Sequence, residues 1–311
     1  MAPAAGTREA AGPARSLADL LDATFQYWAL VPALLILLAL TLYPMLSILR
    51  MAVSTIDFAQ GQFLWTFTGL QNWRSFVEDW LFRIALRNTL IFVIAAVTIE
   101  MLLGLSLALL ACQIQMGKGI YRTIMVLPIL VPAVAIGCMW RLMYNYDFGI
   151  FNQALVALGL TPLAWLADPR LAMASVILVD IWHWVPFVFL ILLAGLEALP
   201  VEALEAANVD GANGWQRLRY VILPMIGPTL SVVVMFRTIF AFKVFDEIFL
   251  LTSGGPGTAT EVVSLYIYKV FFAENRLGYG ALLAILTILT ICAFVGTYRW
   301  TRLGRRDPWA G

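Results

Sequence analysis

The stretch "EALEAANVDGANGWQRLRYVILP", residues 202–224, lies between two long apolar segments and decides how the whole chain is interpreted. Every residue of 201–209 except Asn208 suits a helix interior, and Pro200 stands where proline is tolerated at a first helical turn. Glu202 and Glu205 fall in that turn, where the helix dipole favours carboxylates. The residues therefore predict a short helix at this place.

A turn and a second short helix are expected to follow. Asp210 and Gly211 end the first helix, because glycine reaches the left-handed conformation common at helix ends. Residues 215–220 then lead into Leu223 and Pro224, where the chain becomes apolar again. Such a helix pair is either an ordinary amphipathic element at a membrane surface or a flat, alanine-rich surface on which a partner's groove closes. Composition alone does not separate these two interpretations.

The composition is that of a membrane protein. The chain has 311 residues, of which 62% are hydrophobic and 13% charged, whereas about 25% are charged in ordinary soluble proteins. A net charge of +1 leaves no basic surface for nucleic acid. The three cysteines show no CxxC or metal-ligand spacing, which argues against a disulfide framework or a zinc site.

Six apolar windows are long enough to cross a bilayer, which takes about 20 helical residues. They are residues 29–49, 88–111, 120–143, 171–195, 225–251 and 279–300. Residues 1–28 and 301–311 are then tails on one side of the membrane. Basic residues close to the spans on that side mark it as cytoplasmic; they are Lys118, Arg122, Arg217, Arg219, Arg299, Arg302, Arg305 and Arg306. Four arginines on the opposite side weaken this signal, namely Arg50, Arg74, Arg83 and Arg87.

The spacing within the opening stretch separates the two interpretations. Glu205, Ala206 and Ala207 are followed after three residues by Gly211, and after nine more by Val221, one residue, Leu223 and Pro224. This pattern closely resembles the cytoplasmic loop of binding-protein-dependent ABC importer permeases, which reads EAA, x3, G, x9, I, x, LP. Val221 stands where isoleucine is usual, a minor chemical difference.

Further stretches resemble the carbohydrate-uptake branch of that family, in its maltose-type first permease subunit. They are "RNTLIF", "LPILVPAVAIGCMW", "FGIFNQAL" and "FLLTSGGPGTATEVVSLYIYKVFF". The resemblance covers residues 29–300 and implies an all-α, type I importer permease fold with a coupling helix in the loop at 197–224, between spans four and five.

The same resemblance implies partners and a location. It implies a second, related permease subunit, two cytoplasmic ATPase subunits that bind ATP and Mg²⁺, an external solute-binding protein, and a carbohydrate solute moved inward across the bacterial cytoplasmic membrane. The ATPase-coupling residues it marks are Glu205, Ala206, Ala207, Gly211, Leu223 and Pro224.

No motif for chemistry of its own is present in the chain. A P-loop requires GxxxxGK[ST], but the one Gly-Lys pair, at residues 117–118, is followed by glycine. Gly254, Gly255 and Pro256 belong to a glycine-rich stretch without lysine, which predicts a rigid external turn. His183 is the single histidine, and no GxSxG is present, so a hydrolase site or a cofactor or metal in this chain is not expected.

Charged residues within the spans should face the protein interior, because exposure to lipid costs a few kcal/mol each. They are Glu100, Asp180, Arg237, Lys243, Asp246 and Glu247. Glu100 and Arg237 fall near mid-depth and can pair, with each other or with the partner permease. Lys243 and Glu247 are four residues apart and can pair along one helix.

A second candidate site is a solute path. In "DIWHWVPF", residues 180–187, an acid and several aromatic rings surround a proline that can kink the span. Aromatic packing explains this run equally well. Our hypothesis is that Asp180, Trp184, Phe242 and Asp246 line the path. An ion-coupled secondary carrier is the alternative function, although no internal repeat of the kind such carriers use is visible, and an intramembrane enzyme is the remotest.

Overall fold

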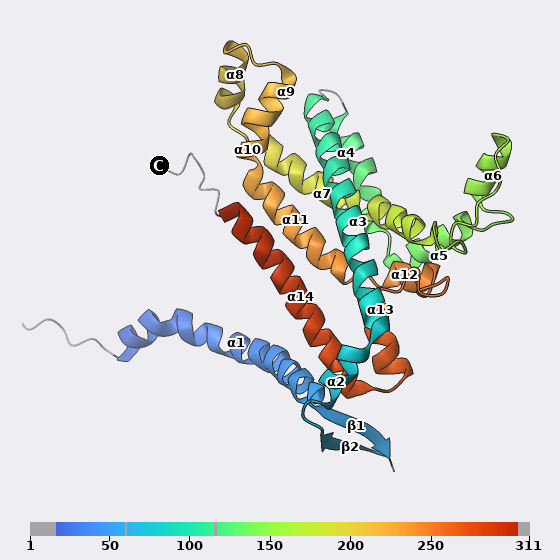
Figure 1. Ribbon diagram of the computed structural model, residues 1–311. Coiled ribbons are helices and arrows are strands. Elements are labelled where there is room, and N and C mark those ends of the chain that lie inside the picture. Colours follow the sequence, from blue (N-terminus) through green and yellow to red (C-terminus); the bar gives the residue numbers. More distant parts are fainter. Residues whose placement is uncertain (1–16, 60, 115–116, 304–311) are drawn as a thin grey trace, which may run out of the picture. The chain divides into compact units, whose positions relative to one another are not determined.

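The computed structural model describes residues 17–59, 61–114 and 117–303. The chain divides into two compact units, Met1–Arg50 and Met51–Gly311. The first unit contains most of α1 (Leu17–Ala52), whose residues 29–52 are long and apolar enough to span a membrane. Apolar side chains along α1 are exposed, for example Leu40 and Tyr43. All the elements that follow belong to the second unit (Figure 1).

A β-hairpin is an addition to the expected helical fold. Strand β1 (Ser54–Ala59) pairs antiparallel with β2 (Gln62–Phe67). Residues 55–58 of β1 alternate polar and apolar side chains, and Gly61 adopts a φ of +78° in the turn, a conformation that glycine takes at little cost. Helix α2 (Gln71–Glu78) holds the root of the hairpin, because the buried amide of Asn72 donates to the backbone oxygens of Ala52 and Ser54, at 2.8 and 3.2 Å.

Two long helices form the centre of the second unit. Helix α3 (Trp80–Gln113) packs along α7 (Ala172–Glu197). The two backbones come close at Gly104, where an added Cβ would lie 2.6 Å from Val188 Cγ1. Small residues are the usual means of close helix packing in membranes, where apolar burial gives no preference for protein over lipid.

The third expected span is broken. Helix α4 (Lys118–Val126) and the short 3-10 turn η1 (Leu127–Leu130) are bent by 92° against α5 (Ala133–Met143). Pro132 precedes α5 and has no backbone N–H to continue a helix. Helix α6 (Ile150–Ala157) follows in the next loop. The described residues contain five helices fit to span a membrane, or six if the bent pair is one span.

The fifth span is interrupted as well. Helix α11 (Gly227–Phe242) ends before α12 (Asp246–Leu251) begins. The prediction of a Lys243–Glu247 pair along one helix is therefore wrong, because the break removes the i, i+4 geometry. The carboxylate of Glu247 instead lies 3.2 Å from Nδ1 of His183.

The last elements are α13 (Val263–Tyr268), the π-helical segment η3 (Lys269–Ala273) and α14 (Leu277–Leu303). The carboxylate of Asp79 caps α3 by accepting from the backbone N–H of Phe82 at 2.9 Å. It also accepts from the hydroxyls of Tyr266, at 2.7 Å, and Tyr279. Burial raises the pKa of Asp79, but these hydrogen bonds outweigh it and bring the pKa below its ordinary value. Asp79 thus ties the N-terminal ends of α3 and α14 together through α13.

Candidate functional site

The alanine-rich helix of the opening stretch is α8 (Val201–Val209), the residues for which the sequence predicts a helix. Pro200 is its N-cap in an extended conformation, and Glu202 lies in its first turn. Glu205 is the fifth residue of the helix and lies beyond that turn, so its predicted place in the first turn is wrong. Figure 1 shows α8 and α9 (Gly214–Arg217) at one end of the second unit, with α2 and the start of α14 at the other end. The predicted helix pair therefore lies at one end of the spans and away from their middle.

The turn after α8 is closed by backbone hydrogen bonds. Gly211 has a φ of +74°, and its N–H donates to the oxygen of Asn208 at 3.1 Å. The N–H of Ala212 donates to the oxygen of Ala207 at 3.0 Å. These two bonds form a Schellman motif, which requires a left-handed residue at its centre. A residue with a Cβ would cost about 1–2 kcal/mol in that conformation, so the glycine is needed for its backbone.

The second helix is held just as firmly. Asn213 and Gln216 form a capping box, each side chain accepting from the other residue's backbone N–H at 2.9 and 2.8 Å. The guanidinium of Arg217 donates to the side chain of Asn208 at 3.0 Å and joins α9 to α8. The chain continues through the π-helical segment η2 (Leu218–Ile222) and α10 (Leu223–Met225), which contains Leu223 and Pro224. The helix pair is thus one rigid unit.

The surface of this helix pair is partly apolar, and short side chains such as Ala206 give it little relief. Glu205, Ala206 and Gly211 are exposed, whereas Ala207 is buried. Val209 is 88% exposed and Trp215 69% exposed, so both side chains are available for contact with another molecule. The arrangement has no catalytic group and suits a contact between proteins.

A buried ionic triad connects three helices at mid-depth. Arg237 in α11 forms two bonds with Glu100 in α3, Nε to Oε2 at 2.5 Å and Nη2 to Oε1 at 2.6 Å. The same Nη2 donates to Oδ2 of Asp180 in α7 at 2.8 Å. All three side chains are at most 2% exposed. The predicted Glu100–Arg237 pair is confirmed within this chain, and Asp180 is its third member.

The four proposed path residues occupy different surroundings. Asp180 belongs to the triad, and the half-buried ring of Trp184 lies 4.6 Å from the Arg237 guanidinium. Phe242 is buried and packs edge-to-face against Phe294, with ring centroids 5.9 Å apart. Asp246 is exposed at the first residue of α12. Trp184 also stacks on Phe240, with ring centroids 5.4 Å apart. Because Arg237 contacts both Asp180 and Trp184, the structure brings these two together. It leaves Phe242 and Asp246 apart from them.

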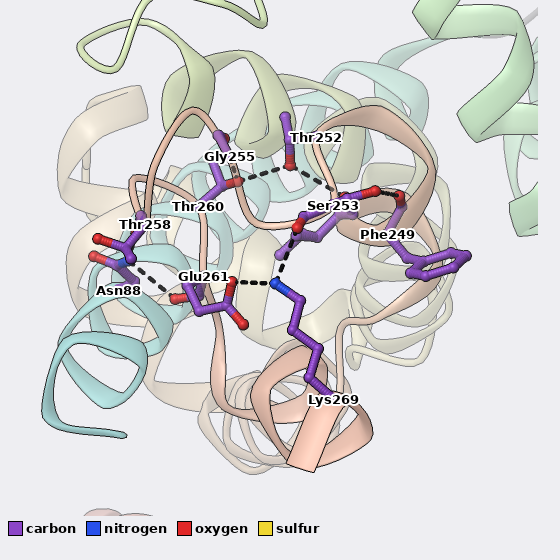
Figure 2. Close-up of polar contacts among 10 residues, drawn as sticks. Asn88, Phe249, Thr252, Ser253, Gly255, Thr258, Thr260, Glu261 and Lys269 are labelled. Carbon is purple, nitrogen blue, oxygen red and sulfur yellow. Dashed lines mark hydrogen bonds and ion pairs between the residues drawn. The ribbon is translucent and has the colours of Figure 1, made fainter. Parts of the chain in front are cut away.

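The glycine-rich turn at residues 252–261 is closed by the hydrogen bonds drawn in Figure 2. The ammonium of Lys269 lies 2.6 Å from the Glu261 carboxylate and 3.1 Å from the backbone oxygen of Ser253. The Thr260 hydroxyl lies 2.7 Å from that of Thr252 and donates to the oxygen of Gly255 at 2.7 Å. These hydrogen bonds tie the two ends of the turn to each other and to η3.

The start of α3 also holds this turn. The side-chain amide of Asn88 donates to the backbone oxygens of Thr258 and Glu261, at 2.9 and 3.0 Å. Gly254 has a φ of +91°, and an added Cβ would lie 2.1 Å from the Glu261 carboxylate. Gly255 and Pro256 complete the turn.

The sequence did not predict two contacts: the salt bridge between Asp180 and Arg237 and the contact between His183 and Glu247. A charge count would have pointed to the first. Glu100 and Asp180 supply two carboxylates for one guanidinium, and each buried charge needs a partner.

Comparison of the sequence with known proteins shows the family of this chain. The sequence profile of the family "Binding-protein-dependent transport system inner membrane component" matches residues 115–303. The trehalose/maltose transport system permease protein MalF of Thermococcus litoralis is 34% identical over 287 residues, which cover 92% of this chain and 96% of that protein. The sulfoquinovosyl glycerol transport system permease protein SmoG of Agrobacterium fabrum is 31% identical over 88% of this chain and 89% of its own length.

A solved structure shares the fold. The crystal structure of a bacterial ABC transporter involved in the import of the acidic polysaccharide alginate contains a similar chain, with a TM-score of 0.80 at 23% identity. The match covers 93% of this chain and 99% of that one. The type I importer permease fold expected from the sequence is thereby confirmed.

Proposed function

The chain belongs to the family of binding-protein-dependent transport system inner membrane components, and from this premise we propose that it couples carbohydrate uptake to ATP hydrolysis in partner subunits. It is a multi-pass membrane protein and a permease subunit of an ABC importer. Its own part is to provide half of a pore that opens alternately to each side of the membrane. ATP and Mg²⁺ bind to the partner ATPases, and this chain carries out no hydrolysis.

The observation that carries the proposal is the rigid helix pair α8–α9. Its exposed Ala206 and half-buried Ala203 let a partner's groove approach closely, as helices dock in grooves elsewhere. Its Schellman turn and capping box prevent the two short helices from bending separately. Movement of an ATPase subunit that holds α8 would therefore pass through α9 to α11 as a push or pull on the span.

The solute class follows from the relatives. The names of two similar permeases specify trehalose/maltose and sulfoquinovosyl glycerol, and both compounds carry sugar rings. We infer that a sugar contacts the half-buried Trp184 and the exposed Asp246, because the apolar faces of a sugar suit aromatic rings. Asp180 contributes through Arg237, which contacts the Trp184 ring, whereas Phe242 is buried against Phe294 and has no direct contact with the sugar in this proposal.

The remaining partners complete the assembly. A second, related permease forms the other half of the pore, and two ATPase subunits dock on the cytoplasmic helix pairs. An external solute-binding protein delivers the solute to the outer loops, including the turn at Gly254, Gly255 and Pro256. The complex lies in the bacterial cytoplasmic membrane with both termini of this chain in the cytoplasm.

The test compares two glycines in the same loop. Gly211→Leu places a side chain at a φ of +74°, whereas Gly214→Leu places it at an ordinary φ, and neither position has an atom within 4 Å of the added Cβ in the described chain. The assembled complex is purified, its subunits are identified, and uptake of trehalose and maltose and ATP hydrolysis are measured in vesicles.

We expect Gly211→Leu to separate ATP hydrolysis from uptake and Gly214→Leu to preserve both. Glu205→Lys should reduce the amount of ATPase that co-purifies, because it reverses the charge of an exposed side chain on α8. Equal uptake by both glycine variants would refute the coupling role of the turn. Uptake that follows a proton or sodium gradient without ATPase subunits would favour the secondary carrier instead.

A further inference from the structure

A groove on one face of α3 has no part in the proposed function. Its volume is about 610 Å³. It is lined by Arg83, Leu86, Arg87, Leu90, Ile91, Ile94 and Ala95. These positions recur every three or four residues, so they form one continuous helix face. The two arginines lie at its N-terminal end, and the remainder of the lining is apolar.

The arginines lie at the depth of lipid headgroups. Helix α3 has 34 residues, whereas about 20 suffice for the hydrocarbon core. The apolar window begins at residue 88, directly after Arg87, and Arg83 lies about 6 Å further along the helix axis at 1.5 Å per residue. Trp80 begins the helix and is 62% exposed, and tryptophan is the residue typical of this membrane level.

Both guanidinium groups lack an acidic partner among the residues that the structure describes. Ion pairs within 4.0 Å involve other residues. The contact of Arg83 Nε is with the backbone oxygen of Asp79, at 3.4 Å, and the Asp79 carboxylate is held by Tyr266 and Tyr279. Like charges four residues apart on a helix repel each other by about 0.2–0.5 kcal/mol. An anion between them would turn this repulsion into attraction.

We propose that this groove binds one anionic phospholipid, with the phosphate held between Arg83 and Arg87 and an acyl chain along Leu90, Ile91 and Ile94. Guanidinium groups bind phosphate oxygens through paired, charge-assisted hydrogen bonds. Basic sites at span ends are suited to acidic headgroups. The proposal also explains why arginines lie at this end of α3, where the positive-inside rule does not favour them. It depends on the membrane placement of α3 and not on the transported solute.

The test measures bound lipid on the purified, assembled complex. The complex is exchanged into nanodiscs with one part phosphatidylglycerol to nine parts phosphatidylcholine, returned to mild detergent, and analysed for retained lipid by mass spectrometry. We expect phosphatidylglycerol to be enriched in the wild type. Arg83→Gln with Arg87→Gln should lower the enrichment about tenfold, which corresponds to about 1.4 kcal/mol.

Two further variants separate the alternatives. Arg74→Gln with Arg170→Gln makes the same charge change at exposed positions outside the groove and should leave the enrichment unchanged. Ile94→Trp fills the apolar half, because Ile94 is 57% exposed, and should lower the enrichment although both arginines remain. Excess inorganic phosphate should not displace a lipid that is also held by its chain.

Three outcomes would overturn the proposal. One is an absence of enrichment in the wild type, and another is equal enrichment in the groove variant and its matched control. The third is loss of the second permease subunit, with unchanged lipid, when the arginines are replaced, since the groove would then hold a protein helix. Circular dichroism of each variant establishes that it is folded.

Discussion

Replacing Arg237 by methionine should destabilise the protein far more than removing either acid that it contacts. Methionine has a similar length but no charge. In Arg237→Met the carboxylates of Glu100 and Asp180 lose the guanidinium they share at 2.5–2.8 Å, at positions no more than 2% exposed. Two like charges then remain in the interior of the helix bundle without a counter-charge.

The magnitude follows from what each change leaves behind. Removing one partner of a buried pair costs about 3–5 kcal/mol, because the other charge is left uncompensated. Asp180→Asn removes one carboxylate and leaves the two-bond Glu100–Arg237 pair intact, so we expect a loss of about 1–2 kcal/mol, the range for one weakened hydrogen bond. Combining Arg237→Met with Glu100→Gln and Asp180→Asn removes every charge of the triad and should recover most of the loss.

The measurement is the free energy of unfolding in mild detergent, obtained by titration with a denaturing detergent and followed by circular dichroism. Arg237→Met and Asp180→Asn are compared in the same preparation, together with the triple variant. Equal losses of unfolding free energy in the two single variants would refute the reasoning, because they would show that Arg237 does not compensate the charges of both carboxylates. A triple variant no more stable than Arg237→Met would refute the assigned cause.

Two further changes test other parts of the fold. The folded-state pKa of Asp79 lies below its unfolded value of about 3.9, so its stabilising effect is complete above about pH 3.9 and is lost as pH falls through the folded pKa. Asp79→Asn should lower the free energy of unfolding at neutral pH. In a series of unfolding measurements at different pH, the variant should also lack the loss of stability that Asp79 causes at acidic pH. Gly104→Ala brings a Cβ to 2.6 Å from Val188 Cγ1, whereas Gly296→Ala meets no atom within 4 Å in the described chain. The first substitution should cost about 1–3 kcal/mol of stability, and the second should be neutral or stabilising. Equal thermal midpoints for the two variants would contradict the close approach of α3 and α7.

The glycine-rich segments show how far local rules reach. Gly211 was expected to end a helix in the left-handed conformation, and it does so at a φ of +74°. The glycine-rich turn at residues 252–261 is closed by hydrogen bonds that its own sequence does not indicate. Asn88 and Lys269 close that turn from other helices, and nothing in the turn's own residues specifies them.

The interrupted spans show where local rules fail. Residues 120–143 read as one apolar span, yet the chain bends by 92° at Pro132. Proline permits a kink in a membrane helix without requiring one, because neighbouring groups can satisfy the freed backbone. Whether the helix continues through proline depends on what packs beside it, which the linear pattern does not contain.

The sequence by itself determined the membrane class, most of the spans, the helix pair after Pro200 and the need for buried charges to be paired. Each of these depends on apolar length, capping residues or backbone preference over a few positions. Only the tertiary structure decided that Arg237 serves both Glu100 and Asp180, and that Glu247 faces His183. Arg237 and Glu100 are 137 positions apart. Contacts over such separations are selected by the packing of helices against one another, where a rotation of one helix by a single residue would bring a different side chain to the same place.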